Sequence, residues 1–319
     1  MLDAAHPTRA RQWSRRDAFA LAAACCVTLL ASCSREPEPP PPVPEPTPTP
    51  EPPPPPPPPM YAIKVDNIAA ARPHVGLAAA DVIVIEPVEY GLTRILAVYA
   101  GDLPETVGPV RSARTTDIEL LAQLGEPTFA YSGAAPHVLS ALGDAPLVSA
   151  SEQAFAAAFF RDPARRAPHN LYVRPAQLPP PAREPTQPVI EFGSAPEGGT
   201  ETSSHRVGYQ RATYDFAWVP EAGRWSITLD GSPMISAGEG DLSTTNVVVQ
   251  EVPVTIEPNG SPLAATVGEG RVTVLREGLR FDGRWHRPAR EEPTRYTTDE
   301  GAPLPLQEGT TWVLLVPAP

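Results

Sequence analysis

Residues 80–101, ADVIVIEPVEYGLTRILAVYAG, decide the fold class of this chain. Two apolar runs, residues 80–91 and residues 93–101, are rich in Val and Ile, which favour β-strands. Tyr90 and Gly91 end the first run, and a glycine at such a boundary is typical of a short turn. The stretch therefore predicts two consecutive strands joined by a tight turn.

The sequence around this strand pair predicts a mixture of strands and helices. Further strands are expected at residues 61–67 (YAIKVDN) and 126–133 (EPTFAYSG). Helices are expected at residues 115–125 (TTDIELLAQLG), 134–144 (AAPHVLSALGD) and 151–162 (SEQAFAAAFFRD). Gly143 is expected to end the second helix, and Ser151 to cap the third. These elements predict an α+β N-terminal domain over residues 60–173.

A proline-rich break at residues 174–188 separates this region from one of different character. From residue 189 onward, short apolar and β-branched runs alternate with Gly, Pro and Asp turns, and no helix is predicted. The predicted fold class is therefore α+β. A mixed N-terminal α/β sandwich-like domain is followed by a β-rich C-terminal domain over residues 189–319.

The N-terminus has the features of a lipoprotein signal peptide. Arginines within the first 16 residues precede an apolar run at residues 18–31, and LASC ends at Cys33. The run of about 14 residues is shorter than the ~20 that a membrane-spanning helix needs. We expect cleavage before Cys33, which would carry the lipid; a signal without a lipid and a short anchor are the alternatives. The motif SRRDAF resembles a twin-arginine export signal, so that route and the general secretory route both stay open.

The segment between the signal and the first strand is mostly proline. Residues 34–59 cannot form a core, and their composition predicts an extended polyproline II linker. With residues 1–33 as signal peptide, this linker would hold the folded part away from the membrane. The expected location is the outer face of the cytoplasmic membrane, in the cell envelope.

Composition excludes several classes of function. The chain has 25 Lys and Arg against 37 Asp and Glu, a net charge of −12, which argues against a nucleic-acid-binding partner. Two of its three cysteines, Cys25 and Cys26, lie in the signal peptide, and the third is Cys33. The mature domain then has no cysteine for disulfides, thiol catalysis or metal binding. No cofactor is predicted, and the sequence holds no nucleotide-binding P-loop. It also holds no Gly-x-Ser-x-Gly pattern, so a serine hydrolase is not expected.

The strongest candidate for a binding site is GPVRSAR, residues 108–114, which leads into the first predicted helix. Arg111 and Arg114 would lie on one side of the chain if the helix has already begun. Two guanidinium groups at a helix start suit a phosphate or a carboxylate, and Ser112 adds a hydroxyl. The segment predicts an anion-binding site.

Other polar residues fall at the predicted ends of strands and in loops. Candidate ligand-binding residues are Arg72, Arg94, His169 and Asn170, and candidate acid–base or arginine-pairing residues are Asp66, Glu86 and Glu89. If the strand ends converge, they form a cleft that holds arginines and carboxylates together. The carboxylates, with Asp117, would then either leave the arginines free for a ligand or pair with them internally. No metal site is predicted, because no ligand spacing supports one.

Two of these candidates have alternative roles. Glu86 and Glu89 would form a catalytic carboxylate pair only if Pro87 bends the strand, because residues three apart on a strand point to opposite faces. His169 is either an acid–base or anion-contacting group, or a histidine bonded to backbone.

Three segments give the chain a resemblance to the YerB-like family of bacterial lipoproteins, built on a domain of unknown function. GLTR, GPVRSAR and RRAPHNLY occur here in the family's order, and NVVVQ, FDGRWHR and EGTTWVLLVP resemble its companion β-rich domain. The resemblance covers most of residues 60–319 and implies a lipid-anchored envelope protein without an established activity. The family pattern has Glu-Gly-Gly where this chain has Glu89-Tyr90-Gly91.

Three hypotheses follow for the function. The first is a lipid-anchored protein, attached to the membrane through its N-terminus, that binds an anionic cell-wall or envelope ligand in an arginine-lined cleft. The second is an envelope hydrolase or transferase that uses Glu86 or Glu89. The third is a structural or assembly lipoprotein whose arginines are paired internally.

Overall fold

The computed structural model describes residues 57–319, which belong to one compact unit. The predicted signal peptide at residues 1–33, the predicted lipidation site Cys33 and linker residues 34–56 lie outside the described residues. Within residues 57–319, no helix has the length and apolar character needed to cross a bilayer.

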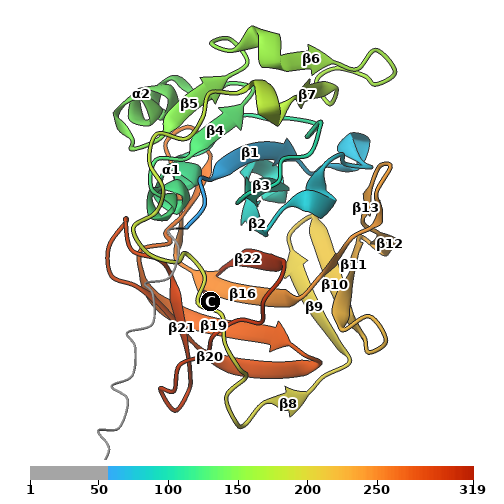
Figure 1. The fold of residues 1–319 in the computed structure, drawn as a ribbon, viewed down its shortest axis with the longest axis vertical. Coiled ribbons are helices and arrows are strands. Elements are labelled where there is room, and N and C mark those ends of the chain that lie inside the picture. The colour runs from blue at the N-terminus through green and yellow to red at the C-terminus, as the bar shows by residue number, and fades with distance from the viewer. Residues whose placement is uncertain (1–56) are drawn as a thin grey trace, which may run out of the picture. The chain divides into compact units, whose positions relative to one another are not determined.

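An 11-stranded sheet runs through the whole unit (Figure 1). Its strands are β1 (Tyr61–Asp66), β2 (Val82–Pro87), β3 (Thr93–Tyr99), β4 (Thr128–Tyr131), β5 (Val148–Ser151), β8 (Thr200–Glu201), β16 (Asn246–Val252), β19 (Gly268–Arg276), β20 (Leu279–Arg287), β21 (Arg295–Thr298) and β22 (Thr311–Pro317). The order across the sheet is β21-β20-β19-β16-β22-β2-β3-β1-β4-β5, with β8 on β20. Strands from before and after residues 174–188 therefore share one sheet.

The predicted strand pair at residues 80–101 lies in the middle of this sheet. β2 and β3 form an antiparallel hairpin, and β3 continues antiparallel to β1. On its other edge β2 pairs in parallel with β22, which also pairs in parallel with β16. β22 carries apolar side chains on both faces, with Trp312 and Leu314 on one and Val313 and Leu315 on the other. The hairpin thus joins the two halves of the molecule through backbone hydrogen bonds.

The two faces of the sheet carry separate hydrophobic cores. One face packs against a second sheet made of β9 (Ser204–Tyr209), β10 (Ala212–Val219), β11 (Arg224–Leu229), β12 (Ser232–Pro233) and β15 (Ser243–Thr244). There Tyr214 and Phe216 of the second sheet contact Trp312 edge-on, with ring centroids 6.4 Å apart. The opposite face is covered in its N-terminal half by α1 (Thr115–Leu121) and α2 (Pro136–Asp144), and Ile118 and Leu121 of α1 join its core.

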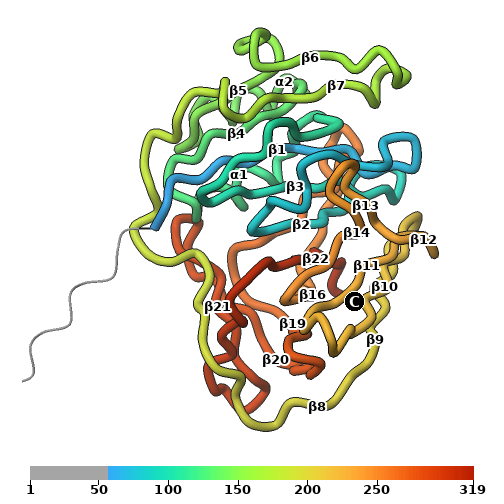
Figure 2. Tube along the Cα trace, turned by 45° about the vertical axis from the view of Figure 1, so that its right-hand side comes forward, coloured from blue at the N-terminus to red at the C-terminus, as the bar shows by residue number. Residues whose placement is uncertain are grey.

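Short strand pairs and one long connection complete the fold. The pairs are β6 (Phe159–Arg161) with β7 (Leu171–Val173), β13 (Ile235–Ser236) with β14 (Gly240–Asp241), and β17 (Val254–Ile256) with β18 (Pro262–Ala264). The connection from β7 to β8 runs along the outside of the molecule from one half to the other (Figure 2). Single 3-10 turns occur at residues 69–71, 77–79, 89–91, 122–124, 156–158 and 175–177.

The structure is mostly β, and one predicted helix is wrong. Residues 151–162 do not form a third helix, because Ser151 ends β5 and its hydroxyl accepts the Ala154 amide in a turn. Phe159 and Phe160 then enter β6, where Phe160 stacks on Tyr172 of β7 at 5.7 Å. Aromatic residues favour such cross-strand pairs, which here override the helical propensity of the alanines.

Another difference concerns the end of the second helix. Gly143 lies inside α2, which continues to Asp144 before the chain becomes extended at Ala145. The remaining predicted strands and helices before residue 150 are confirmed, as is the absence of helices in the described residues after position 189.

Candidate functional site

The candidate site lies where β1 and β4 end, on the face of the sheet that α1 covers. β1, β4 and β5 are parallel, so their carboxyl ends meet at one edge, which is where open α/β sheets bind ligands. The loop at residues 108–114 fits between the two strand ends. Its Arg111 amide donates to the Lys64 carbonyl at 2.8 Å, and the Ser132 amide donates to the Arg111 carbonyl at 3.0 Å. These bonds place the arginines of GPVRSAR at the sheet edge.

Both arginines of this loop precede the helix. α1 begins at Thr115 with Arg114 as its extended N-cap residue, and the Asp117 carboxylate accepts the Arg114 amide at 2.7 Å. The predicted arrangement of Arg111 and Arg114 on a first helical turn is therefore not the observed one. The loop itself, tied to β1 and β4, brings them together.

Arg94, Arg111 and Arg114 form a cluster that we call the arginine cluster. Arg94 lies on β3 directly opposite Asp66 of β1, and its Nη1 donates to the Ser112 carbonyl at 2.9 Å. Nη1 of Arg114 reaches the same carbonyl at 3.3 Å. Burial, then the charges of Arg114 and Arg111, lower the pKa of Arg94 to about 10. Arg94 and Arg114 therefore meet at one backbone carbonyl, and Arg111 is close enough for its charge to act on Arg94.

Two of the three arginines have a carboxylate partner. Arg114 Nη2 donates to Glu89 Oε2 at 2.7 Å, and Arg111 Nε lies 3.2 Å from Asp66 Oδ2, at ion-pair distance but without hydrogen-bond geometry. Arg94 is 9% exposed, and among residues 57–319 no carboxylate lies within 4.0 Å of it. Arg94 is the cation of the cluster that the described protein leaves without an ion pair.

His169 is oriented by the buried carboxylate of Asp66. Its Nδ1 donates to Asp66 Oδ2 at 2.6 Å, and Asp66 Oδ1 accepts the Asn67 amide at 2.9 Å. With Nδ1 engaged, Nε2 of His169 is the nitrogen left to interact with a ligand, and the side chain is 18% exposed. Both the Gly108–Pro109 and the Ala167–Pro168 bonds, in the loops that carry Arg111 and His169, are cis.

Glu89 is held in its ionised form. Burial on its own would raise the pKa of this carboxyl, but hydrogen bonds from Arg114 and from the Ser261 hydroxyl lower it to about 2. Ser261 follows the turn between β17 and β18 in the second half of the chain. In the same turn, Glu257 accepts a hydrogen bond from Thr115 Oγ1 at 2.9 Å. Sequence reasoning missed Ser261 and Glu257, and no local signal marks them.

Glu86 belongs to a buried charged group beneath the cluster. Lys64 of β1 contacts the Glu86 carboxylate and donates to Asp117 Oδ1 at 2.8 Å, and none of the three side chains is exposed. Lys64 was also missed, although a single lysine inside the apolar strand YAIKVDN was a usable signal. Because one lysine takes both carboxylates, Glu86 and Asp117 are not partners of Arg94.

Two further predicted residues make contacts outside the cluster. Arg72 donates to Asp230 at 3.1 Å and to the Asn67 carbonyl at 2.9 Å. Asn170 accepts from Arg161 at 3.1 Å and donates to the Asp162 carbonyl at 3.3 Å, which fixes the loop before β7. Among the described residues, no group of three or more His, Cys, Asp or Glu side chains is placed to hold a metal ion.

Comparison with known proteins identifies related sequences and a related fold. Residues 48–185 match a family model described as the N-terminal domain of proteins of unknown function DUF3048, and residues 205–313 match the model of its C-terminal domain. A Bacillus subtilis (strain 168) protein named "Putative lipoprotein YerB" is 25% identical over 271 residues, 80% of each chain. The crystal structure of the YerB protein from Bacillus subtilis superposes with a TM-score of 0.71 at 23% identity, covering 82% of this chain and 91% of that one.

Proposed function

The chain belongs to the DUF3048 family, and from this premise we propose that it is a lipid-anchored envelope protein that binds an oxyanion at the arginine cluster. The ligand class is a phosphate or carboxylate group of a cell-wall or envelope component. Arg94 would contact it directly, flanked by Arg111 and Arg114. The Ser112 and Ser132 hydroxyls, 3.4 Å apart, would be neutral donors beside it.

One observation carries the proposal: Arg94 has no carboxylate partner among the described residues. Four cations, Lys64 and the three arginines, lie on this face with four carboxylates, but two carboxylates share Lys64. The formal charges of the whole group balance, but its outer end holds three guanidinium groups against two carboxylates, Asp66 and Glu89. A buried guanidinium without an anion is costly, and a bound oxyanion would offset that cost with charge-assisted hydrogen bonds.

The proposed location is supported by a relative's name and by the N-terminal sequence. A similar protein is named "Putative lipoprotein YerB", which supports lipidation of this chain at Cys33 after removal of residues 1–32. Residues 34–59 would be the linker. The proposed domain organisation keeps an α+β N-terminal region at 60–173, a connection at 174–188 and a β-rich region at 189–319, built on one shared sheet.

The test is thermal unfolding of residues 34–319, which include both cores, against phosphate, glycerol phosphate and acetate. At a ligand concentration 100 times Kd, binding stabilises the folded state by roughly 2.7 kcal/mol. We expect an anion-dependent rise in Tm that Arg94→Gln abolishes. Arg206→Gln, which removes the same charge from an exposed pair with Asp215, is the matched control and should keep the rise. A rise of equal size in Arg94→Gln, or no rise with any anion, would contradict the proposal.

The geometry also favours a second candidate, an envelope hydrolase or transferase with His169 as the acid–base group. The supporting observation is the 2.6 Å contact that orients the ring on Asp66. Glu86 has no exposed surface and Glu89 is kept ionised by Arg114, so the carboxylate-pair mechanism has less support. Turnover of chromogenic phosphodiesters and esters, reduced at least ~100-fold in both His169→Gln and Asp66→Asn, would support catalysis. Turnover unaffected by either substitution would exclude this role.

A further inference from the structure

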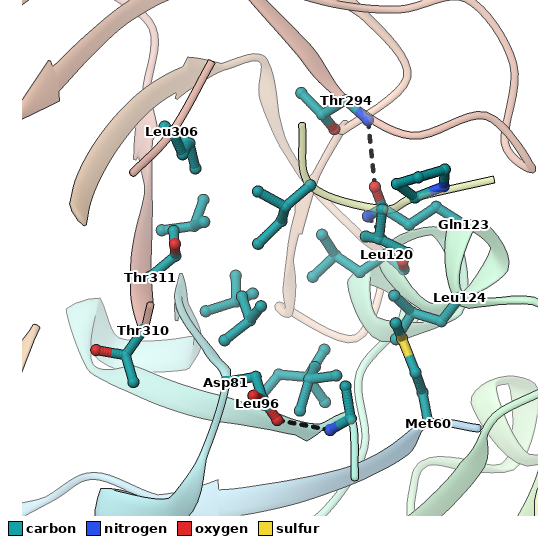
Figure 3. Close-up of a pocket in the computed structure, with 18 of the residues that line it drawn as sticks. Met60, Asp81, Leu96, Leu120, Gln123, Leu124, Thr294, Leu306, Thr310 and Thr311 are labelled. Carbon is teal, nitrogen blue, oxygen red and sulfur yellow. Dashed lines mark hydrogen bonds between the residues drawn. The ribbon is translucent and has the colours of Figure 1, made fainter. Parts of the chain in front are cut away.

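A separate cavity of about 660 Å³ lies over the same face of the central sheet (Figure 3). Its floor is made by β3, β2 and β22. Its walls include the end of α1, the 3-10 turn after it, and Pro188, Val189, Ile190 and Phe192 of the connection from β7 to β8. Leu96 and Val98 of β3 and Val313 and Leu315 of β22 line the floor. Residues from before and after the connection between β7 and β8 therefore line one cavity.

The lining is predominantly apolar, with polar side chains among the remaining lining residues. The sides are closed by Leu120 of α1, by Leu124 of the 3-10 turn that follows it, and by Met60 and Leu306, as Figure 3 shows. The volume is within the range of roughly 300–1,000 Å³ typical of small-molecule sites. Burial of an apolar chain against the apolar side chains of the floor would remove their surface from water, which favours an apolar occupant.

The charges at the cavity restrict what that occupant can be. Asp81 and Glu308 are the charged residues among those that line it, and both are acidic. The Asp81 carboxylate accepts the Ala100 amide at 2.6 Å, and the Gln123 side-chain oxygen accepts the Thr294 amide at 3.3 Å (Figure 3). These polar groups sit at the margin of the apolar floor. With no basic side chain among the lining residues, a carboxylate or phosphate head group would be repelled.

We propose that this cavity binds the apolar chain of an uncharged amphiphile, such as a long-chain alcohol or an acyl ester. The chain would lie on the floor formed by Leu96, Val98 and Val313. Its polar end would meet the hydroxyl and carboxylate groups of Asp81, Thr310 and Thr311 at the margin. The acidic margin selects against fatty acids and anionic lipids by charge.

The path of the chain supports a membrane source for the ligand. Pro57 and Pro58 line the cavity, so the N-terminal linker reaches the fold at this site. If Cys33 carries a lipid, as proposed above, the 23 residues between Cys33 and Pro57 would bridge at most roughly 75 Å at the ~3.1 Å per residue of a polyproline II chain. The source rests on that proposal, whereas binding itself rests on the cavity alone.

The cavity and the arginine cluster are distinct. Along β3 the side chains of Arg94, Leu96 and Val98 point to the same face, but Arg94 belongs to the cluster and the other two line the cavity. At about 3.3 Å per residue, Arg94 and Val98 are roughly 13 Å apart. The buried group of Lys64, Glu86 and Asp117 belongs with the arginine cluster, because Glu86 of β2 lies directly opposite Arg94 of β3. The two proposals can therefore fail independently.

The experiment compares two probes with the same chain and different heads, 1-monolauroylglycerol and laurate, each below its micellar concentration. Displacement of a fluorescent apolar dye from residues 34–319 gives the two Kd values. We expect monolauroylglycerol to displace the dye and laurate to bind at least ten-fold more weakly. Equal affinity for laurate would overturn the assignment of an uncharged head, and no displacement by either probe would overturn the site.

Variants on a single strand locate the binding. Val313→Phe would fill the cavity from β22 and should weaken monolauroylglycerol binding at least ten-fold. Val316→Phe is the matched control, because Val316 is a half-buried residue on the opposite face of the same strand and its variant should bind normally. If Val313→Phe fails to fold, Val82→Phe on β2 makes the same test. Arg94→Gln should leave this affinity unchanged, and unaltered binding in a folded cavity-filling variant would overturn the proposal.

Discussion

Tyr90 adopts a left-handed backbone conformation, with φ of 63°, in the turn between β2 and β3. Its side chain is 83% exposed and contributes little packing. This conformation raises the free energy of a residue with a Cβ atom by about 1–2 kcal/mol, whereas glycine adopts it without that cost. The turn geometry thus explains why glycine suits this position, and why the chain tolerates tyrosine only at a cost in stability.

We expect Tyr90→Gly to stabilise the protein by about 0.5–1 kcal/mol, because the relief of strain exceeds the entropy that glycine adds to the unfolded chain. Tm should rise by roughly 1–4 °C in calorimetry. Gly91→Ala is the contrasting variant: φ is 71° there and a Cβ would collide with the Gln210 side chain, so Tm should fall. An unchanged or lower Tm in Tyr90→Gly would show that the turn is not strained.

His74 predicts an acid-dependent loss of stability. Burial, partly opposed by its hydrogen bond to the Asp66 carbonyl, lowers the pKa of His74 to about 4. Between pH 6.5 and pH 4 the unfolded chain binds a proton that the folded chain does not, so stability is full above pH 6.5 and falls as the pH drops. The loss should reach roughly 3 kcal/mol near pH 4.

The measurement is urea unfolding of the wild type and of His74→Gln at pH 7.0, 5.5 and 4.5. Glutamine keeps an N–H donor but cannot titrate, so its stability should fall less over this range. Parallel pH profiles for the two proteins would disprove a role for His74.

At the scale of elements, the buried group of Lys64, Glu86 and Asp117 links β1, β2 and α1. Lys64→Met would leave two buried carboxylates without a counter-charge, and we expect a loss of about 3–5 kcal/mol in urea unfolding. Adding Glu86→Leu removes one of those charges and should recover part of the loss. If the double variant is no more stable than the single one, the group does not act through its charge.

The same elements show what sequence alone can and cannot predict. β1, β2 and β3 are predictable because apolar β-branched runs and a glycine turn determine them locally. The helix predicted at residues 151–162 fails because Phe159 and Phe160 pair with β7, a contact that local propensity does not contain.

For the site, the sequence placed the candidate residues at element ends that would form a cleft only if those ends converged. In the structure Asp66, Arg94, Arg111 and His169 lie together, whereas Arg72 and Asn170 make their contacts elsewhere. Which carboxylate pairs with which cation was not predictable, because Lys64 reaches across two elements to take Glu86 and Asp117.

At the scale of the whole molecule, the two halves of the chain complete each other. β22 pairs with β2 and β16, and each core contains residues from before and after the connection between β7 and β8. The proline-rich residues 174–188 form part of this connection. They do not separate two independent cores. Pairing between strands this far apart leaves no local trace in the sequence.

This continuity predicts that the halves stay together without a covalent link. A protease site inserted between Glu197 and Gly198, in an exposed turn, should be cleavable without separating the fragments. We expect the cut protein to elute from size-exclusion chromatography at the position of the uncut control and to separate in denaturant. Separation in native buffer would show that the shared sheet contributes little to association.

The position of β22 also has a consequence for biosynthesis. Val82 pairs with Thr311, about 230 residues later, and translation at roughly 5–20 residues per second takes some 10–45 s to cover that distance. Throughout this time the edge of β2 is unsatisfied and open to wrong pairing. A ribosome that stalls before Thr311 releases a chain without the strand that joins its halves, so incomplete products should go to proteases instead of accumulating as half-folded domains.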